Sequence, residues 1–412
     1  MTRQLRLNAF LKPAGEYLAG WRHPDSPPDA GVNFPYVSRL VQALEAAKFD
    51  AVFIPDLAGL PDTHPTVLER VAVVNDTFEP VSLLAALVPL TTHIGLFGTV
   101  STSYSDPLEV ARIFATLQAL SGGRAGWNAV TSLNHGEAVN FGGSALADHA
   151  SRYARAEEFA DVVLGLWGQG GQPFFEHGGQ HFTISPTRPF TSPPLSRPII
   201  AQAGASEAGK QFAARVAEVI FTNIREYDGV KAYRADLRKR AETFGRHPDN
   251  VIICPNLETV IAPTRDEAQE KFGRLKALLH PRVALGDVEY WLGGVSLADL
   301  PLDAPLPPLP VTEKSVSTQQ RWYQQAQEQR LTIRDLVHRI ANGNHTLIGT
   351  PQDVADHIEH WFTTGAADGF NVAFPYLPTT LTDFTRWVVP ELQRRNLFRK
   401  DYGAAHAVQA RA

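Results

Sequence analysis

The chain has 412 residues, of which 44% are hydrophobic and 20% charged, so it is long enough for one large domain or two or three small ones. Its net charge of -5 gives no electrostatic reason to expect nucleic acid or an anionic membrane as a partner, and its single cysteine, Cys254, excludes an intramolecular disulfide and a cysteine-built metal site. The start of the chain lacks the apolar core of a signal peptide, and the longest apolar run, 81–90, is too short to cross a membrane, so we predict a soluble cytoplasmic protein.

Apolar, β-branched runs alternate with helical stretches along the chain. The predicted strand and helix pairs are 5–11 and 35–49, 50–56 and 80–90, 93–102 and 107–120, 123–132 and 148–167, 197–204 and 206–216, 217–224 and 229–244, 250–262 and 264–279, and 370–378 and 380–395. Continuous apolar runs of this kind are typical of parallel strands buried on both faces, which need helical crossovers. Eight such units favour a single (β/α)8 barrel domain over residues 1–412, although an open doubly wound sheet would show the same periodicity.

Three segments interrupt this alternation and are predicted to be insertions of that domain: 57–79, 168–196 and 281–345. Loops that follow barrel strands lie on the catalytic face. The first insertion comes directly after the second strand, so we expect it to form a wall of the site. The second insertion follows a helix, so the sequence does not determine on which side of the barrel it lies.

The segment SGGRAGWN has a glycine spacing that fits neither a dinucleotide fingerprint nor a phosphate loop. Gly122 and Gly123 follow a helix, where glycine ends helices, and Gly126 inside the next strand predicts that another group approaches the backbone closely. Alternation places Trp127 and Asn128 on opposite faces, and we expect Trp127 to face the helices and the Asn128 amide to face the barrel mouth. A buried amide needs a hydrogen-bond partner, which is either neighbouring backbone or a bound polar heterocycle.

Several motifs resemble those of one enzyme family: LSGGRAGWNAVTS (120–132), NFG (140–142), HASRYARAEEF (149–159), QAGASEAG (202–209) and GTPQDVADHIEHW (349–361). In these motifs the chain is similar to the nitrilotriacetate, EDTA and dibenzothiophene-sulfone monooxygenases, which are flavin-dependent enzymes of the bacterial-luciferase-like superfamily. The resemblance extends from about residue 5 to about residue 402. It implies a (β/α)8 barrel that uses O2 and FMN, the FMN being supplied in reduced form by a separate NAD(P)H-dependent flavin reductase.

The resemblance further implies that a flavin (hydro)peroxide oxygenates or cleaves a small organic substrate, at a C–S or C–N bond or a heteroaromatic ring, and that the protein is a homodimer or homotetramer. The second insertion contains PFFEHGGQHF, and the third is rich in Pro and Leu. These compositions favour a partly aromatic or apolar substrate over a polyanion.

Polar residues at strand ends are expected to contact the flavin ring. Asp56 ends the second strand, where family members carry an acidic residue beside the isoalloxazine, and Thr102 ends the third strand. Both positions would equally suit residues that cap a turn. The resemblance makes Asp56, Thr102 and Asn128 candidate cofactor-binding residues.

Two helix starts are expected to bind the FMN phosphate. His149 and Tyr153 are four residues apart and share a face in the first turn of a helix, the end that favours anions. Ser206 begins another helix, where it can cap the helix and still offer its amide to a phosphate. The resemblance makes Ser206 a phosphate ligand, with backbone contacts from Gly204 and Ala205.

The chemistry requires no protein nucleophile, because the cofactor carries out the difficult step. His23, after the first strand, and His345, at the end of the third insertion, are candidate acid–base residues, although each would also fit an ordinary loop histidine. Arg22 and Arg188 are candidate anchors for an anionic substrate.

Two alternatives use the same barrel: hydride transfer with a deazaflavin and no O2, or flavin binding without catalysis. A metal-dependent hydrolase is disfavoured, because the 14 histidines include no H-x-H after the first strand. The sequence therefore predicts no metal site.

Overall fold

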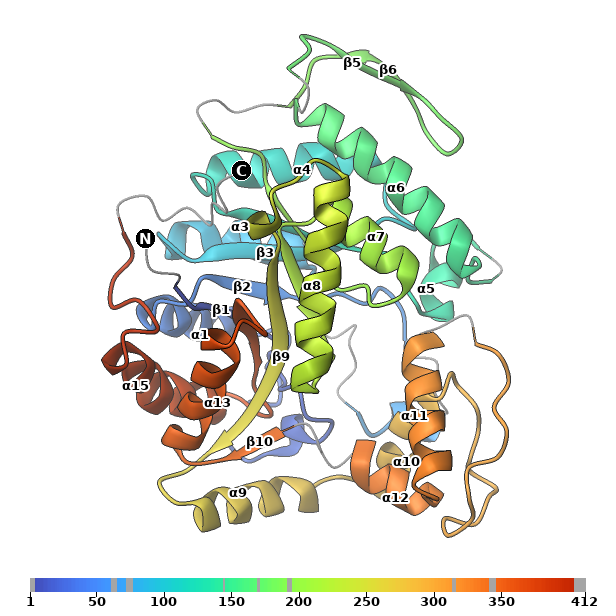
Figure 1. Cartoon of the computed structure of the whole chain (residues 1–412), viewed down its shortest axis with the longest axis vertical. Helices are drawn as coiled ribbons and strands as arrows, with labels where there is room; N and C mark the ends of the chain where they lie inside the picture. Colours follow the sequence, from blue (N-terminus) through green and yellow to red (C-terminus); the bar gives the residue numbers. More distant parts are fainter. Residues whose placement is uncertain are drawn as a thin grey trace.

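Eight parallel strands close into a barrel in the computed structural model, which describes residues 4–60, 65–71, 77–143, 145–168, 171–190, 195–312, 316–340 and 346–403. In ring order the strands are β1 (Arg6–Phe10), β2 (Ala51–Ile54), β3 (Gly95–Ser101), β4 (Ala125–Val130), β7 (Ile199–Gln202), β8 (Val219–Thr222), β9 (Ile252–Ile261) and β11 (Gly369–Ala373). β9 pairs with both β8 and β11, and β11 pairs with β1, so the ring is complete (Figure 1). The predicted (β/α)8 barrel is confirmed, and the open sheet is excluded.

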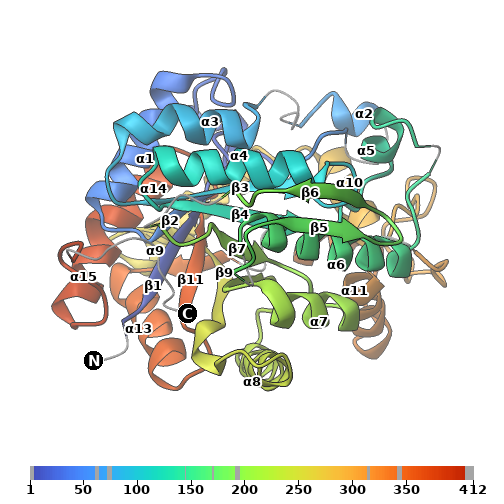
Figure 2. The ribbon, with the colours of Figure 1, turned by 90° about the horizontal axis from the view of Figure 1, so that it is seen from above.

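Helices surround the barrel, as the view from above shows (Figure 2). They are α1 (Phe34–Ala46), α3 (Pro80–Leu87), α4 (Pro107–Leu120), α6 (His149–Leu166), α7 (Glu207–Val216), α8 (Tyr227–Thr243), α9 (Arg265–Ala277), α13 (Pro351–Thr363) and the continuous run α14 (Thr379–Asp383), η5 (Phe384–Val388) and α15 (Val389–Arg394). Capping side chains fix where several of them start, since Asp106, Asp148 and Ser206 each accept a backbone N–H from the first turn. These helices start after strands end, so their N-termini gather at one end of the barrel, here called the mouth.

In the described residues, the sheet that forms the barrel has one further strand outside the ring. β10 (Thr346–Gly349) pairs with the far end of β9, from Glu258 to Ile261, and leads directly into α13. The eight predicted strand–helix units did not include this pair of elements, which the third insertion separates from β9.

The interior of the barrel is apolar at the level of the strand starts. Its side chains come from alternate strand positions and are Ala51, Phe53, Phe97, Ala201, Val219, Phe221 and Cys254. Gly126 faces this layer, and a Cβ atom built on it would lie 1.9 Å from the Phe97 ring. The group that the sequence predicted to approach Gly126 is therefore a neighbouring side chain of the protein itself.

Ion pairs tie together the strand starts at the opposite end, the base of the barrel. Asp50, just before β2, accepts hydrogen bonds from Arg6 (2.9 Å), Arg399 (2.7 Å) and the backbone N–H of Leu7 (2.8 Å). Burial alone would raise the pKa of the Asp50 carboxyl, but Arg399 and Arg6 hold it below its ordinary value. Asp368, just before β11, pairs in the same way with two arginines of α8.

The third insertion folds as a helical unit with its own apolar cluster. Its helices are α10 (Pro281–Trp291), α11 (Val316–Glu328) and α12 (Ile333–Ile340), drawn in orange at the lower right of Figure 1. The buried members of the cluster are Leu285, Val288, Leu292, Leu297, Leu306, Trp322, Ala326, Leu331, Ile333, Leu336 and Ile340. α10 contacts α2 (Pro65–Leu68) of the first insertion, so these two insertions meet.

The second insertion forms a hairpin of β5 (Phe175–Gly178) and β6 (Thr183–Thr187), seen at the top of Figure 1. It packs on α6 through Phe182, whose ring centroid is 5.6 Å from that of Phe159, and through His177, which bonds to Glu158 at 3.0 Å. Phe175 and Phe182 therefore pack against the helix layer, whereas Phe174 is exposed.

Within the described ranges, no helix combines the length and the hydropathy that a membrane span requires.

Candidate active site

Two helix N-termini meet at the mouth, as the sequence predicted for a phosphate site. The imidazole Nε2 of His149, the first residue of α6, lies 3.1 Å from the hydroxyl oxygen of Ser206, the N-cap of α7. The Ser206 hydroxyl also accepts the N–H of Gly209 at 3.1 Å. His149 and Tyr153 pack ring to ring with centroids 4.8 Å apart, so the predicted shared face exists. Free helix N–H groups, a hydroxyl and an imidazole are the donors that bind phosphate in proteins.

The site formed by His149, Ser206 and the first turn of α7 is here called the cradle. A glycine makes it compact. A Cβ atom on Gly204 would lie 2.8 Å from the Gly209 Cα atom and 2.9 Å from the Tyr153 hydroxyl oxygen. The Gly204 N–H is held by the Gln202 side chain at 2.5 Å, and its carbonyl accepts the Tyr233 hydroxyl at 2.8 Å. Gly204 therefore shapes the loop and has its backbone groups engaged within the protein, whereas Ala205 is exposed next to the cradle.

Asn128 projects into the barrel, and Trp127 lies in the helix layer. The Trp127 ring packs against Phe159 and Trp167 at centroid distances of 5.7 and 6.2 Å, so the orientation predicted for the pair is correct. The Asn128 amide nitrogen donates to the Thr99 hydroxyl at 3.1 Å. Its buried Oδ1 accepts no hydrogen bond from any described residue. Leaving a buried amide oxygen unpaired costs about 1–3 kcal/mol, and an N–H group of a ligand could remove this cost.

The cradle and Asn128 belong to neighbouring strands. Asn128 on β4 lies beside Ala201 on β7, and the chain continues from β7 into the loop that holds Gly204 and Ser206. A ligand with an anionic end and a polar ring would therefore meet both features on one side of the mouth.

Asp56 and Thr102 follow their strands at the mouth but differ in solvent exposure. Asp56 is exposed beyond β2. Thr102 has no exposed surface, and its hydroxyl donates to the Val130 carbonyl at 3.0 Å, so it ties β3 to β4. The neighbouring hydroxyls of Ser101 and Ser132 lie 2.8 Å apart and bond to each other.

A group of charged residues that the sequence did not single out occupies another part of the mouth. Glu258, on the inner face of β9, accepts a hydrogen bond from the Thr346 hydroxyl, and burial raises its pKa to about 7. Burial likewise raises the pKa of Asp287, on α10, to about 7 and lowers that of Arg225, beyond β8, to about 10. All three side chains are half-buried, so they line the mouth without being sealed from water. No sequence signal marks this group, because its members lie in different segments and Glu258 belongs to a largely apolar strand.

Comparison with known proteins assigns the family. The model of the luciferase-like monooxygenases matches residues 16–368. The chain belongs to the luciferase-like monooxygenase family. It is a flavin-dependent monooxygenase, and the family resemblance in its motifs is confirmed.

Relatives of this luciferase-like monooxygenase span nearly its full length. It is 38% identical to the N-acetyl-S-(2-succino)cysteine monooxygenase of Bacillus subtilis and 37% identical to nitrilotriacetate monooxygenase component A of Aminobacter aminovorans, each alignment covering 97% of this chain and 94% of the relative. The solved structure of a riboflavin lyase with modified FMN and riboflavin superposes with a TM-score of 0.85 and 28% identity, covering 97% of this chain and 94% of the other.

Of the two candidate acid–base histidines of the monooxygenase, the structure describes one. His23 stacks on Tyr376 with ring centroids 3.8 Å apart, and its Nδ1 accepts the N–H of Asp25, so it stabilises its own turn. Burial lowers the pKa of His23, which keeps it neutral at pH 7. His345 lies outside the described residues.

Neither arginine proposed from the sequence as an anchor faces the barrel interior. Arg22 donates to the Leu278 carbonyl at 2.9 Å on the outside of α9. Arg188 lies 6.0 Å from the Phe174 ring, beside the outer hairpin.

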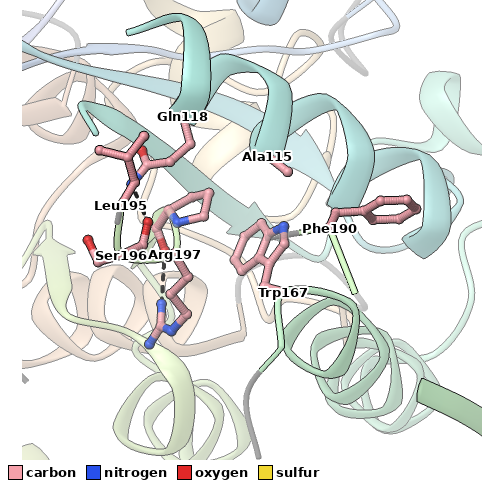
Figure 3. Close-up of a pocket in the computed structure, with 8 residues that line it drawn as sticks. Ala115, Gln118, Trp167, Phe190, Leu195, Ser196 and Arg197 are labelled. Carbon is pink, nitrogen blue, oxygen red and sulfur yellow. Dashed lines mark hydrogen bonds between the residues drawn. The ribbon is translucent and has the colours of Figure 1, made fainter. Parts of the chain in front are cut away.

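A small cavity of about 30 Å³ lies at the base of the barrel, between α4 and the segment before β7 (Figure 3). Its wall includes Trp167 and Gln118, whose amide donates to the Ser196 carbonyl at 2.7 Å. The cavity has room for water and is too small for a flavin. It lies at the opposite end of the barrel from the cradle. Among the described residues, no group of three or more His, Cys, Asp and Glu side chains is arranged to hold a metal ion.

Proposed function

We propose that the protein is the oxygenase component of a two-component system, which takes reduced FMN from a separate NAD(P)H-dependent reductase in the cytoplasm. The observation that carries this proposal is the combination of the His149–Ser206 cradle with the unpaired Oδ1 of Asn128. FMN has a phosphate at one end and a ring N–H at the other, so it would satisfy both. FMN, when bound, supplies the electrons that activate O2.

The protein's part in this reaction is to bind, orient and exclude water. Ser206, His149 and the α7 amides hold the phosphate, with Tyr153 and Ala205 at its side. Asn128 fixes the polar edge of the ring. Asp56 and the β3 end at Thr102 flank the ring position, and the α10–α12 unit, which meets α2, shields the mouth from solvent.

We propose a substrate in which a C–S or C–N bond is oxygenated or cleaved. The compounds in the names of the two relatives are N-acetyl-S-(2-succino)cysteine, which is a thioether, and nitrilotriacetate, which is a tertiary amine. Both compounds carry carboxylates. The charged residues around Glu258 and Arg225 suit such polar substrates better than an aromatic one.

Flavin binding tests the cradle. We expect the protein to bind FMN more tightly than riboflavin, which lacks the phosphate, in fluorescence titrations. Ser206→Ala and His149→Ala should each weaken FMN binding about tenfold and leave riboflavin binding nearly unchanged, because hydrogen bonds to a charged group contribute about 1.5–3 kcal/mol. Thr264→Ala, which removes the N-cap of α9, is the matched variant that should leave both affinities unchanged.

Oxygen uptake tests the reaction. With a flavin reductase, NADH and FMN, the protein should form an oxygenated product from thioether or amine carboxylates. Formation of H2O2 alone with every compound would instead support a flavin-binding protein without catalysis. Binding of a deazaflavin in preference to FMN would support the hydride-transfer alternative. The expected homodimer or homotetramer is checked by measuring the mass in solution.

A further inference from the structure

Arg225 is a cation at the mouth whose guanidinium is paired with no acidic side chain among the described residues. It comes three residues after β8, and its side chain is half-buried. Glu258, Glu16 and Glu226 lie near enough to act on it electrostatically, but its guanidinium forms no hydrogen bond or ion pair with any described residue. Burial lowers its pKa to about 10, so it is still charged at neutral pH. A charge partly removed from water and left unpaired is unfavourable, and a bound anion would relieve this cost.

A chain of hydrogen-bonded amide side chains ends two residues before Arg225, in the same loop. Asn371 donates to the Oδ1 of Asn256 at 2.9 Å, and Asn256 donates to the Oδ1 of Asn223 at 2.5 Å. The chain starts inside the barrel and ends at Asn223, which is exposed at the mouth two residues before Arg225. Each amide polarises the next, so the terminal N–H groups of Asn223 are stronger donors than those of an isolated amide.

The charges around Arg225 leave a slight positive excess near neutrality, because Arg225 and Arg321 are opposed by Glu226 and a partly ionised Glu258. Glu16 is paired with Lys12 at 2.9 Å. Glu258 has its pKa raised to about 7 by burial, so it is only partly ionised at neutral pH. Arg321, on α11 of the third insertion, adds a second cation that acts on Arg225.

We propose that Arg225 and the terminal amide of Asn223 form a subsite that binds a carboxylate of the organic substrate. A planar guanidinium presents parallel N–H donors that match the two oxygens of a carboxylate, and an amide two residues away in the same loop can donate a further hydrogen bond. This inference rests on the proposed function, because it takes the mouth to be where the substrate enters.

The test uses the full chain loaded with oxidised FMN and two probes, thiodiglycolate and its dimethyl ester. Both contain the same thioether, and only the first carries carboxylates. We expect calorimetry to show thiodiglycolate binding at least about tenfold more tightly than the ester, as expected for hydrogen bonds to a charged group. Arg225→Gln should remove this difference, Arg225→Lys should keep part of it, and Arg188→Gln, on the outer hairpin, should leave it unchanged.

Flavin affinity separates the two proposals. FMN should bind equally well to the wild type and to Arg225→Gln, which also shows that the variant is folded. Equal affinity of the wild type for the two probes, or no binding of thiodiglycolate, would overturn the carboxylate subsite while FMN binding and oxygen uptake remain. A loss of FMN affinity in Arg225→Gln would mean that this arginine binds the flavin phosphate, and it would overturn the subsite as well. Failure of the wild type to bind FMN would reject the proposed function itself.

Discussion

At the scale of single residues, the barrel interior depends on one position without a side chain. Gly126 gives the Phe97 ring the space that a methyl group would fill, at 1.9 Å from the ring. The two residues face each other on paired strands, Phe97 on β3 and Gly126 on β4.

We therefore expect Gly126→Ala to destabilise the fold by about 1–3 kcal/mol, the usual cost of overpacking a core. Urea unfolding measures the loss. Phe97→Leu in the same chain should restore part of the stability, because it removes the atoms that the new methyl group meets. A double variant no more stable than Gly126→Ala would contradict this explanation.

Asn128 shows the opposite case, in which a buried polar group is unsatisfied. Asn128→Leu removes an amide whose Oδ1 has no partner among the described residues. The apo protein should be at least as stable in thermal denaturation, while FMN affinity should fall about tenfold, because the ligand loses a hydrogen bond of about 1–3 kcal/mol. Marked destabilisation of the apo protein with unchanged FMN affinity would show that the amide serves the fold alone.

At the scale of elements, ligand positions arise where neighbouring loops meet. The cradle joins the starts of α6 and α7, and the charged group joins the ends of β8 and β9 to α10. The first was predictable from the sequence, because Ser206 and His149 stand at recognisable helix starts. The second was not, because Glu258 lies in an apolar strand and gains its significance from segments far away in the chain.

Glu258 gives this part of the mouth a pH response. The raised pKa means that the folded state holds a proton which the unfolded chain releases at lower pH. Its contribution to the free energy of unfolding therefore falls as pH rises from about 4 to about 7. The charged groups that face it are Glu16 and Lys12 beyond β1 and Arg225 beyond β8.

We expect Glu258→Gln to be about 1–2 kcal/mol more stable than the wild type at pH 8, after allowance for partial exposure, and equally stable near pH 4. Urea unfolding at the two pH values measures this change. Glu176→Gln, an exposed carboxylate of the outer hairpin, should show no such difference. A Glu258→Gln advantage that is the same at both pH values would point to packing as the cause.

At the scale of the whole molecule, function and stability occupy opposite ends of the barrel. In the described part of the chain, the mouth holds the unpaired Oδ1 of Asn128 and the unpaired guanidinium of Arg225, whereas the base is closed by Asp50 with Arg6 and Arg399. Removing one member of a buried ion group leaves the others unpaired, which costs about 3–5 kcal/mol.

Asp50→Asn should therefore lower the free energy of unfolding by about 3–5 kcal/mol at pH 7. The pKa of Asp50 is held below its ordinary value, so this stabilisation is present above the unfolded pKa of about 4 and is lost as the pH falls further. The gap between wild type and variant, measured by urea unfolding, should narrow in acid. A gap that stays constant down to pH 3 would exclude the ionised carboxylate as its source.

Periodicity and family motifs predicted the eight strand–helix units, the orientation of Asn128 and the two helix starts of the cradle. They did not predict β10, the side of α6 on which the hairpin packs, or the engaged hydroxyl of Thr102. These features depend on which surfaces are free once the barrel has closed. A strand pattern records what each segment buries, and it does not record which distant segment covers it.

Barrel closure also orders events during synthesis. β1 is made long before one of its two partners, β11, and Leu5 bonds to the carbonyl of Leu397. Arg399, which completes the base, follows only two residues later. Until β11 and Arg399 have been made, β1 has one open edge and Asp50 lacks one of its two arginines. The nascent chain thus cannot close the barrel before these distant segments emerge, and until then the open edge of β1 can pair with other strands.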